Sequence, residues 1–471
     1  MSLTGLLFLF VFLPTALILY YVLPDALKEY LLFALSILFY AIGSPGFAIL
    51  FLLVILANVL LGRVMQKLTR QPARRILLIM GIVLDAGILI YYKYTDFAIS
   101  TVNSILGSDF GLMRLALPLG ISFFTFKAIS YLADIYTRKA QLAGNPVHDL
   151  VYLSFFGQIL SGPLTRYNDM TCQQSGAGDR FDLFSEGVTR FLIGFNKKVL
   201  LANVLANITN EVFATPVSDY STLYAWLGSI TYSLQLFFDF AGYSDMAIGL
   251  SNMFGYNCME NFRYPYMTES VAGFWRRWHI SLSEWFRDYI YIPLGGSRAK
   301  KKWRVFFNLL VVWVFTGIWH GAMWTFVAWG LGYFVFISFE RLTGLPKRLS
   351  GPGKGLYRIV ALIFINCQWI LFRSDHILSG LRFIKRLFVY HANSMTDLRI
   401  LFLFREYAVF LAGAFILCFP LFPWLEKKLL VHEKGHVVYQ TLLSIFLLAS
   451  FIWAVSFVVA GQNNPFAYAN F

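Results

Sequence analysis

Long runs of apolar residues recur along the whole chain and constrain its fold more than any other feature. Of 471 residues, 58% are hydrophobic and only 14% are charged, against about 25% charged residues in a soluble domain. A helix of about 20 apolar residues spans the hydrocarbon core of a bilayer. We therefore expect an all-α polytopic membrane protein. The predicted spans are Leu3–Leu23, Tyr30–Ile42, Phe47–Leu61, Ile76–Tyr92, Leu117–Ile135, Leu223–Phe240, Trp303–Trp319, Met323–Phe339, Leu356–Phe372, Tyr407–Phe422 and Val438–Val459.

Some stretches are too short or too polar for simple spans and are predicted to be re-entrant or horizontal segments packed in protein. They are Leu150–Leu160, Phe191–Val212 and Met246–Phe254. The first run has no basic segment before it and no small-residue cleavage site, so it is expected to be a retained span and not a signal peptide.

Basic loops set the expected orientation and account for the net charge of +14, so no nucleic-acid partner is implied. A first basic cluster, from Arg63 to Arg75, is placed in the cytoplasm, and two more runs, Arg298–Arg304 and Arg341–Arg358, join it there. Counting spans from these loops places the N-terminus and the C-terminus outside. The four cysteines are scattered and predict neither a metal site nor a redox site.

The stretch Phe274–Ser297 carries six ionisable residues amid apolar runs, which is costly at membrane depth. Read with helical spacing, Trp275, Trp278 and His279 share one stripe that faces the protein. Arginines fall off this stripe, so a simple interfacial helix anchored by tryptophans is the competing interpretation.

A second segment, Gly317–Trp324, holds His320 at the turn of a predicted hairpin between two apolar runs, beside Trp319. Both flanking loops are basic, so the turn is expected at or beyond the middle of the bilayer. A neutral imidazole there can take a proton from a hydroxyl or thiol. No G-x-S-x-G elbow or Cys–His signature is present, and no H-x-x-x-H, so neither a covalent nucleophile nor a metal is predicted.

Acidic and aromatic residues near these segments are further candidates. Asp239, Tyr243 and Asp245 lie at the end of an apolar run; they are candidates for a polar cavity wall or a charge partner of the arginines, while a capped helix junction is the preferred interpretation for Asp245. Tyr468 lies in an aromatic tail, which usually anchors at the interface, yet its phenol could reach a cavity on that face.

These motifs together resemble the membrane-bound O-acyltransferase family, in its bacterial branch similar to the alginate O-acetyltransferase membrane subunit. The resemblance rests on FLP (Phe12–Pro14), SGP (Ser161–Pro163), FDFAGYSDMAIG, NFRYPY, FWRRWHISLSEWFRDYIYIPLGG and GIWHGAMW. It implies a single domain, residues 1–471, with a ring of about eleven helices around a central tunnel. The parts expected are N-terminal spans 1–149, a catalytic core 150–340 with both histidine motifs, and C-terminal spans with an outside tail 341–471.

The resemblance also implies roles. His320 matches the catalytic histidine of the family and His279 the supporting one. Trp275, Trp278, Asp239, Tyr243 and Trp319 are candidates for lining the cavity, and Tyr468 for carrying the acyl group. The tail departs from the commoner family ending, because Ala469 replaces a flanking aromatic residue.

The leading prediction is an enzyme of the bacterial cytoplasmic membrane. It would transfer an acyl group from a cytosolic thioester for O-acylation of an extracytoplasmic polysaccharide or cell-wall polymer. Acetyl is the leading candidate for this group. No permanent cofactor is expected; the donor substrate is acetyl-CoA or an acyl carrier protein thioester. The basic residues Arg298, Lys300, Lys301 and Lys302 are candidates for attracting donor phosphates, although topology alone explains them.

The expected partners are the lipid bilayer, an outside transferase of the SGNH type and, for D-alanyl transfer to teichoic acid, an acyl carrier protein. The alternative of another class is a transporter or flippase of envelope precursors, in which buried ions line a pathway. A non-catalytic scaffold for an outside transferase is the third option.

Overall fold

In the computed structural model the protein is all-helical over the residues described, which are 1–170, 177–429 and 433–461. Eight helical segments of this part are long and apolar enough to cross a membrane, and Phe8–Val22 is a shorter apolar helix. The prediction of a polytopic all-α membrane protein is confirmed. The count of about eleven spans is not confirmed.

The chain divides into two compact units. The first contains Met1–Phe191 and Met246–Glu260. Its helices, with the short 3-10 and π segments marked η, are η1 (Phe8–Phe12), α1 (Leu13–Val22), α2 (Asp25–Gly43), η2 (Pro45–Phe47), α3 (Ala48–Lys67), α4 (Gln71–Leu89), η3 (Ile90–Tyr94), α5 (Thr95–Leu106), α6 (Ile121–Tyr136), α7 (Pro146–Ser154), η4 (Tyr167–Asp169) and most of α8 (Ala177–Asn196).

The second unit contains Leu192–Asp245 and the chain from residue 261 onward. Its helices are η5 (Lys197–Asn203), α9 (Val204–Ala214), η6 (Val217–Asp219), most of α10 (Thr222–Met253), η7 (Pro265–Met267), α11 (Val271–Trp275), α12 (Ile280–Phe286), η8 (Arg287–Tyr291), η9 (Gly296–Arg298), α13 (Lys302–His320), α14 (Trp324–Thr343), α15 (Leu345–Arg348), α16 (Gly351–Arg373), α17 (Ile377–Phe388), α18 (Ser394–Leu417), α19 (Leu421–Leu429) and α20 (Glu433–Val459). The predicted division at residues 149 and 340 stays a prediction.

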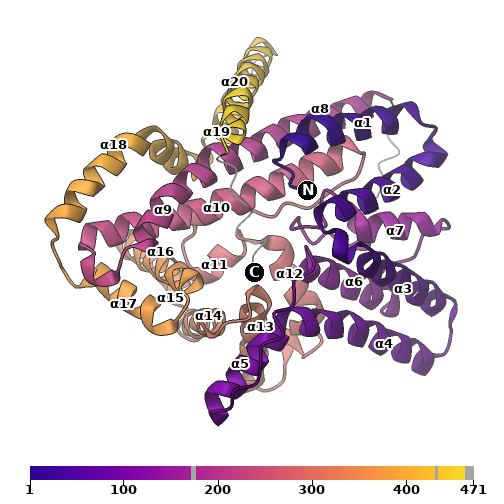
Figure 1. Ribbon diagram of the computed structural model, residues 1–471, viewed down its shortest axis with the longest axis horizontal. Helices are drawn as coiled ribbons and strands as arrows, with labels where there is room; N and C mark the ends of the chain where they lie inside the picture. The colour runs from indigo at the N-terminus through magenta and orange to yellow at the C-terminus, as the bar shows by residue number, and fades with distance from the viewer. Residues whose placement is uncertain (171–176, 430–432, 462–471) are drawn as a thin grey trace. The chain divides into compact units, whose positions relative to one another are not determined.

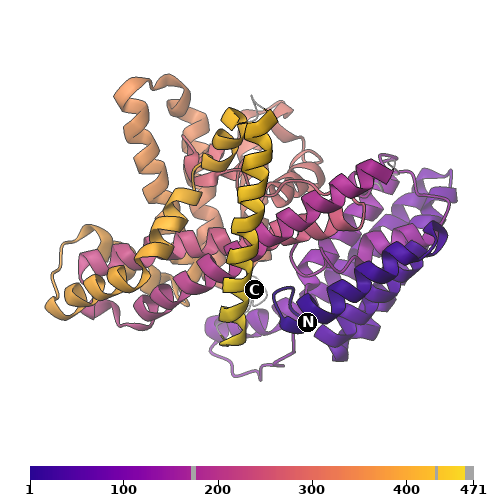
Figure 2. The same ribbon diagram turned by 90° about the horizontal axis from the view of Figure 1, so that it is seen from above.

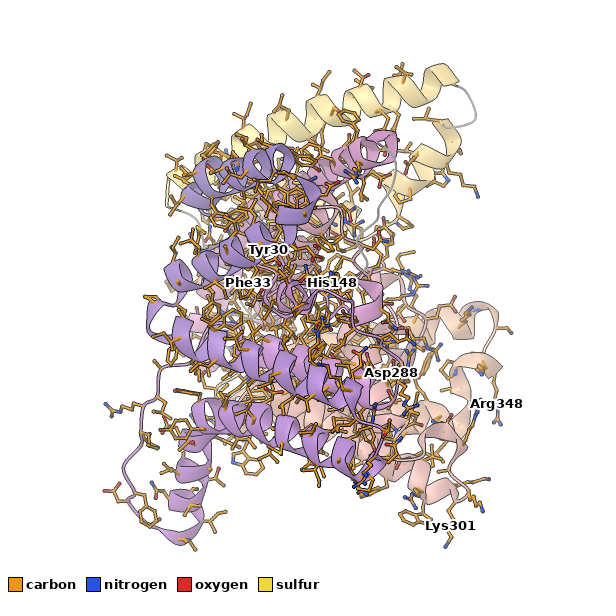
Figure 3. The ribbon with its side chains drawn as sticks, turned by 90° about the vertical axis from the view of Figure 1, so that its right-hand side faces the viewer. Tyr30, Phe33, His148, Asp288, Lys301 and Arg348 are labelled. Atoms are coloured by element: carbon orange, nitrogen blue, oxygen red, sulfur yellow. The ribbon has the colours of Figure 1, made fainter. Side chains whose placement is uncertain are left out.

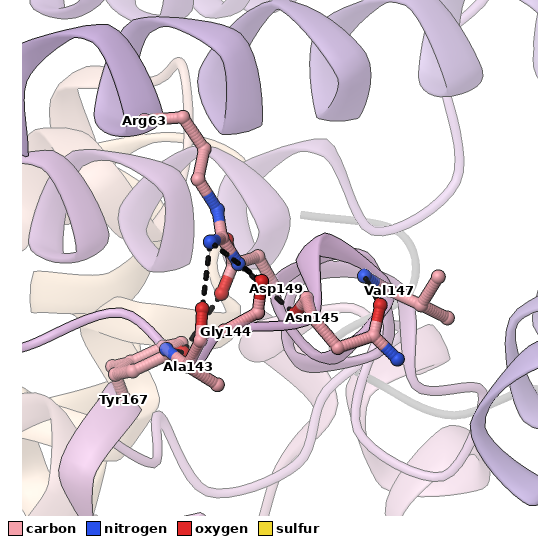
Figure 4. A network of polar contacts seen from close by, with 7 residues as sticks. All are labelled: Arg63, Ala143, Gly144, Asn145, Val147, Asp149 and Tyr167. Atoms are coloured by element: carbon pink, nitrogen blue, oxygen red, sulfur yellow. Dashed lines mark hydrogen bonds and ion pairs between the residues drawn. The ribbon is translucent and has the colours of Figure 1, made fainter. Parts of the chain in front are cut away.

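The first unit is a layer of neighbouring helices in which α3 packs against α4, α6 and α7 (Figure 1). Two arginines, Arg63 half-buried and Arg74 buried, tie its loops together. Arg63 on α3 donates to Asp149 at 2.5 Å and to the carbonyl of Ala143 at 2.6 Å, while Tyr167 donates to the other oxygen of Asp149 at 2.7 Å (Figure 4). Arg74, 2% exposed, donates to the carbonyl of Ile135 at the end of α6. Two basic residues of the first basic cluster therefore have structural roles inside the protein.

In the second unit, α13 and α14 form the predicted hairpin, and α14 also packs against α16 (Figures 1 and 2). The hairpin is tight because glycines remove side chains from its contact. A Cβ at Gly317 would collide with the backbone of Phe326, and one at Gly330 with the carbonyl of Trp313. Because α13 and α14 run antiparallel, both basic runs lie at the same end of the hairpin and the turn at the other.

The hairpin contact gives a test of its close packing. We expect Gly330→Ala to lower the melting temperature of the purified protein, because the added methyl forces the backbones apart at a cost of about 1–3 kcal/mol. Gly355→Ala on α16 is the matched control: its Cβ would enter open space, so Ala there should be neutral or slightly stabilising. Equal melting temperatures for the two variants would contradict the described hairpin contact.

Candidate active site

His320 is the last residue of α13 and lies 2% exposed at the turn of the hairpin. Aromatic rings enclose its imidazole. The ring centroids of Trp319, Trp329 and Phe372 lie 4.9, 5.0 and 5.2 Å from that of His320. Trp329 comes from α14 and Phe372 from α16. Three helices therefore place an ionisable ring in an apolar, water-excluded surrounding.

His279 is fully buried and lies between two short helices, not within one. The prediction of continuous helical spacing through Trp275, Trp278 and His279 is wrong, because α11 ends at Trp275 and α12 begins at Ile280. His279 has φ +45° and ψ +54°, a left-handed conformation that is rare for residues other than glycine. The backbone of Ile280 bonds the carbonyl of Asn261, and that of Arg263 the carbonyl of Arg277. These tertiary hydrogen bonds override the helical periodicity.

Both imidazoles lie beside a single indole. The ring of Trp319 lies 6.1 Å from that of His279 and 4.9 Å from that of His320, between centroids. On its other side His279 meets Phe240 of α10 edge to face at 4.5 Å. The structure thus brings together the two histidines that the sequence singled out, with Trp319 beside both.

Trp275 and Trp278 lie inside the protein, not at a lipid interface. Trp278 is 0% exposed and stacks on Phe274 at 5.3 Å, and Trp275 contacts Trp313 at 5.0 Å. The interpretation as an interfacial tryptophan anchor is therefore wrong for these two residues, because the turn at His279 directs them toward α13 and α16. The arginines between them, Arg276 and Arg277, are exposed.

The acidic candidates lie on an unbroken helix. The predicted helix junction at Ser244 and Asp245 is wrong: α10 runs without interruption from Thr222 to Met253. Asp239 forms a buried ion pair with Lys198, and Asp245 pairs with Lys197 at 2.6 Å. These lysines are charge partners of the two carboxylates. Tyr243, 5% exposed, lies one turn after Asp239 on the same helix.

The basic candidates for donor binding lie far from His320. Arg298, Lys300, Lys301 and Lys302 are exposed, and Lys301 projects from the surface in Figure 3. They precede or begin α13, whereas His320 ends it, so the length of the helix, roughly 27 Å at 1.5 Å per residue, separates them. Their role in donor binding stays a prediction. Tyr468, the candidate acyl carrier, lies outside the described residues.

Two residues that hold the segment around His279 in place escaped sequence reasoning. Asn261, given only a loop role with its NFRYPY neighbours, accepts from His279 Nδ1 at 3.2 Å and from the Ser281 hydroxyl at 2.9 Å. Glu340 on α14 is 5% exposed and accepts from the backbone N–H groups of Val271 and Ala272, at 2.7 and 2.8 Å, and from Tyr357. Its carboxylate therefore caps the N-terminus of α11. Because α11 has only five residues, no periodic pattern in the sequence predicts this helix.

Comparison with known proteins identifies the class. The sequence profile of the MBOAT family, the membrane-bound O-acyltransferases, matches residues 119–374, a range that includes both histidines. The chain belongs to this family and is a multi-pass, membrane-bound O-acyltransferase. The expected enzyme class is confirmed, and the transporter and scaffold alternatives are set aside.

Individual relatives place the chain more closely. It is 38% identical to a probable alginate O-acetylase of Azotobacter vinelandii, over 83% of this chain and 79% of the relative. It is 34% identical to the peptidoglycan O-acetyltransferase of Helicobacter pylori, over 80% and 78%. A teichoic acid D-alanyltransferase of Bacillus subtilis is 33% identical over 56% of this chain and 68% of that protein.

The Glu340 cap gives a test of how the site is held. We expect Glu340→Gln to lower the melting temperature, because an amide has one acceptor oxygen and would turn an N–H group toward a backbone N–H; each lost buried bond costs about 1–3 kcal/mol. Tyr357→Phe removes a single hydrogen bond to the same carboxylate and should have the smaller effect. A Gln variant no less stable than the Phe variant would contradict the capping role.

Proposed function

We propose that this protein transfers an acetyl group from a cytosolic thioester to a hydroxyl of an extracytoplasmic polysaccharide or cell-wall polymer. The observation that carries the proposal is the pair of buried imidazoles that both lie beside Trp319. Water is excluded there, which strengthens electrostatic interactions with a developing charge and suppresses hydrolysis of the donor. The names of the relatives, acetylases of alginate and of peptidoglycan, support this class of acceptor.

In the proposed step His320 accepts the proton of the acceptor hydroxyl. The hydroxyl oxygen forms a bond to the carbonyl carbon of the thioester, and the carbon–sulfur bond breaks. The departing thiolate takes the proton from the His320 imidazolium, which returns the enzyme to its starting state. No enzyme nucleophile and no metal enter this scheme; the chemistry requires a positioned base of suitable pKa.

The close aromatic surroundings of His320 favour a short acyl group. Three aromatic rings stand within about 5 Å of the imidazole, and α13 and α14 are in close contact on that side because of Gly317 and Gly330. The longer matches to O-acetylating relatives than to the D-alanyltransferase favour acetyl over D-alanyl. Acetyl-CoA is the proposed donor. Passage of the group across the membrane by a tunnel, and an outside SGNH-type partner that presents the polymer hydroxyl, are part of the same proposal.

The mechanism predicts that His320→Gln lowers the release of free CoA from acetyl-CoA by about 10²–10⁴-fold, the usual contribution of a general base. The assay uses the full chain in lipid nanodiscs with a polysaccharide acceptor. His376→Gln is the matched control, because His376 is exposed at the start of α17, and it should keep wild-type activity.

Two outcomes would contradict this account. Wild-type activity in a folded His320→Gln protein would remove the base from the mechanism. Consumption of a D-alanyl carrier-protein thioester, with acetyl-CoA left intact, would overturn the acetyl donor.

A further inference from the structure

The amide of Asn261 has a defined orientation. Its Oδ1 lies 3.2 Å from the backbone nitrogen of Ser281 and 2.9 Å from the Ser281 hydroxyl, and its Nδ2 lies 3.0 Å from Ser244 Oγ. Because a backbone N–H can only donate, the atom that faces it must be the oxygen. The amide is fully buried, as are its partners Ser244 and Ser281, so water does not compete for these bonds.

This orientation fixes the proton on the His279 ring. Nδ1 lies 3.2 Å from Asn261 Oδ1, which is an acceptor only, so a bond there requires a proton on Nδ1. Ser281 Oγ lies 3.5 Å from the same nitrogen. The Ser281 hydroxyl donates its single hydrogen to Asn261. The hydroxyl oxygen, like Asn261 Oδ1, therefore presents a lone pair to Nδ1. A neutral imidazole carries one N–H, and Nε2 is therefore the unprotonated nitrogen.

The ring is held neutral and its Nε2 is available. His279 lies outside the eight candidate spans, and burial lowers the pKa of its imidazole well below the usual range. Nε2 is buried and has no hydrogen-bond partner among the residues that the structure describes. A buried acceptor without a partner is costly, by about 1–3 kcal/mol, and the left-handed backbone of His279 adds to the cost. Both features point to a group held ready for a ligand.

We propose that Asn261 is a positioning residue that holds His279 in the Nδ1–H tautomer, so that Nε2 accepts a hydrogen bond from the acceptor substrate. The hydrogen bond to Nε2 is donated by a second hydroxyl, next to the one that His320 deprotonates. A sugar ring presents two such neighbouring hydroxyls. His279 then binds the acceptor substrate. It does not donate a hydrogen bond to the carbonyl oxygen of the thioester. This inference rests on the proposed function.

Two substitutions separate positioning from mere packing. Asn261→Asp keeps an oxygen toward Nδ1 and toward the Ser281 backbone, and Ser244 can donate to its other oxygen. We expect it to keep kcat within about tenfold of the wild type. Asn261→Leu keeps the size of the side chain but removes the acceptor, and kcat should fall by about 10²-fold, the order expected for a misplaced catalytic group. A mere packing role predicts instead that Asn261→Leu keeps kcat, because Leu fills the same space without burying a charge.

The tautomer itself is measured by 15N NMR of the full chain with labelled histidine ring nitrogens. The His279 signals are assigned as those that disappear in the His279→Gln variant. We expect the Nδ1–H pattern in the wild type and in Asn261→Asp, and a shift away from it in Asn261→Leu. Asn366→Leu is the control for a lost buried amide, since Asn366 bonds Ser229 and Ser233 instead of a histidine. It should lower stability and leave the His279 signals unchanged.

An Nε2–H pattern in the wild type, or a folded Asn261→Leu protein with wild-type kcat, would overturn the inference. The NMR measurement needs no donor. A chain that consumes no acetyl-CoA therefore overturns the proposed function, while an Nδ1–H pattern would still support the role of Asn261.

Discussion

Every polar group that is buried in an apolar helical protein must find its partner within the chain, and this constraint shapes the whole structure. An unsatisfied backbone or side-chain group in a membrane interior costs several kcal/mol. The chain meets the requirement with pairs drawn from distant segments: Lys198 with Asp239, Glu340 with the start of α11, and Arg74 with the end of α6. Each pair fixes the position of an element whose own sequence is unremarkable. Nε2 of His279 is among the buried side-chain atoms that have no hydrogen-bond partner in the described part of the chain, and it belongs to the proposed reaction centre.

The site depends on two departures from regular helix. One is the tight α13–α14 turn, where glycines allow the two backbones into contact and set His320 among aromatic rings. The other is the left-handed conformation of His279 itself, between α11 and α12. It turns the imidazole toward Phe240 and Trp319. Both are stabilised by contacts from elsewhere in the unit, as strained conformations at functional sites commonly are. The same two departures bury Trp275, Trp278 and Trp329.

Much of this architecture follows from sequence. Apolar runs locate the α13–α14 hairpin to within a few residues, and the rarity of buried histidine singles out His279 and His320. Local pattern fails where long-range contacts decide. The 3.6-residue spacing predicts one helix through His279, but the backbone bonds from Ile280 to Asn261 and from Arg263 to Arg277 break it. Ser244 and Asp245 have the composition of a helix cap, yet α10 continues because Lys197 meets the charge of Asp245. Asn261 and Glu340 give no local signal, since their partners lie 18 and 69 residues away.

The central claim is that the two imidazoles beside Trp319 form one reaction centre. An experimental structure of the full chain in a lipid nanodisc, with a non-hydrolysable acetyl thioester analogue bound, tests it most directly. We expect the carbonyl carbon of the analogue beside His320, with Trp319 against it and Nε2 of His279 facing the side from which an acceptor hydroxyl would approach. An analogue bound elsewhere, with both imidazoles still enclosed by aromatic rings, would contradict the account.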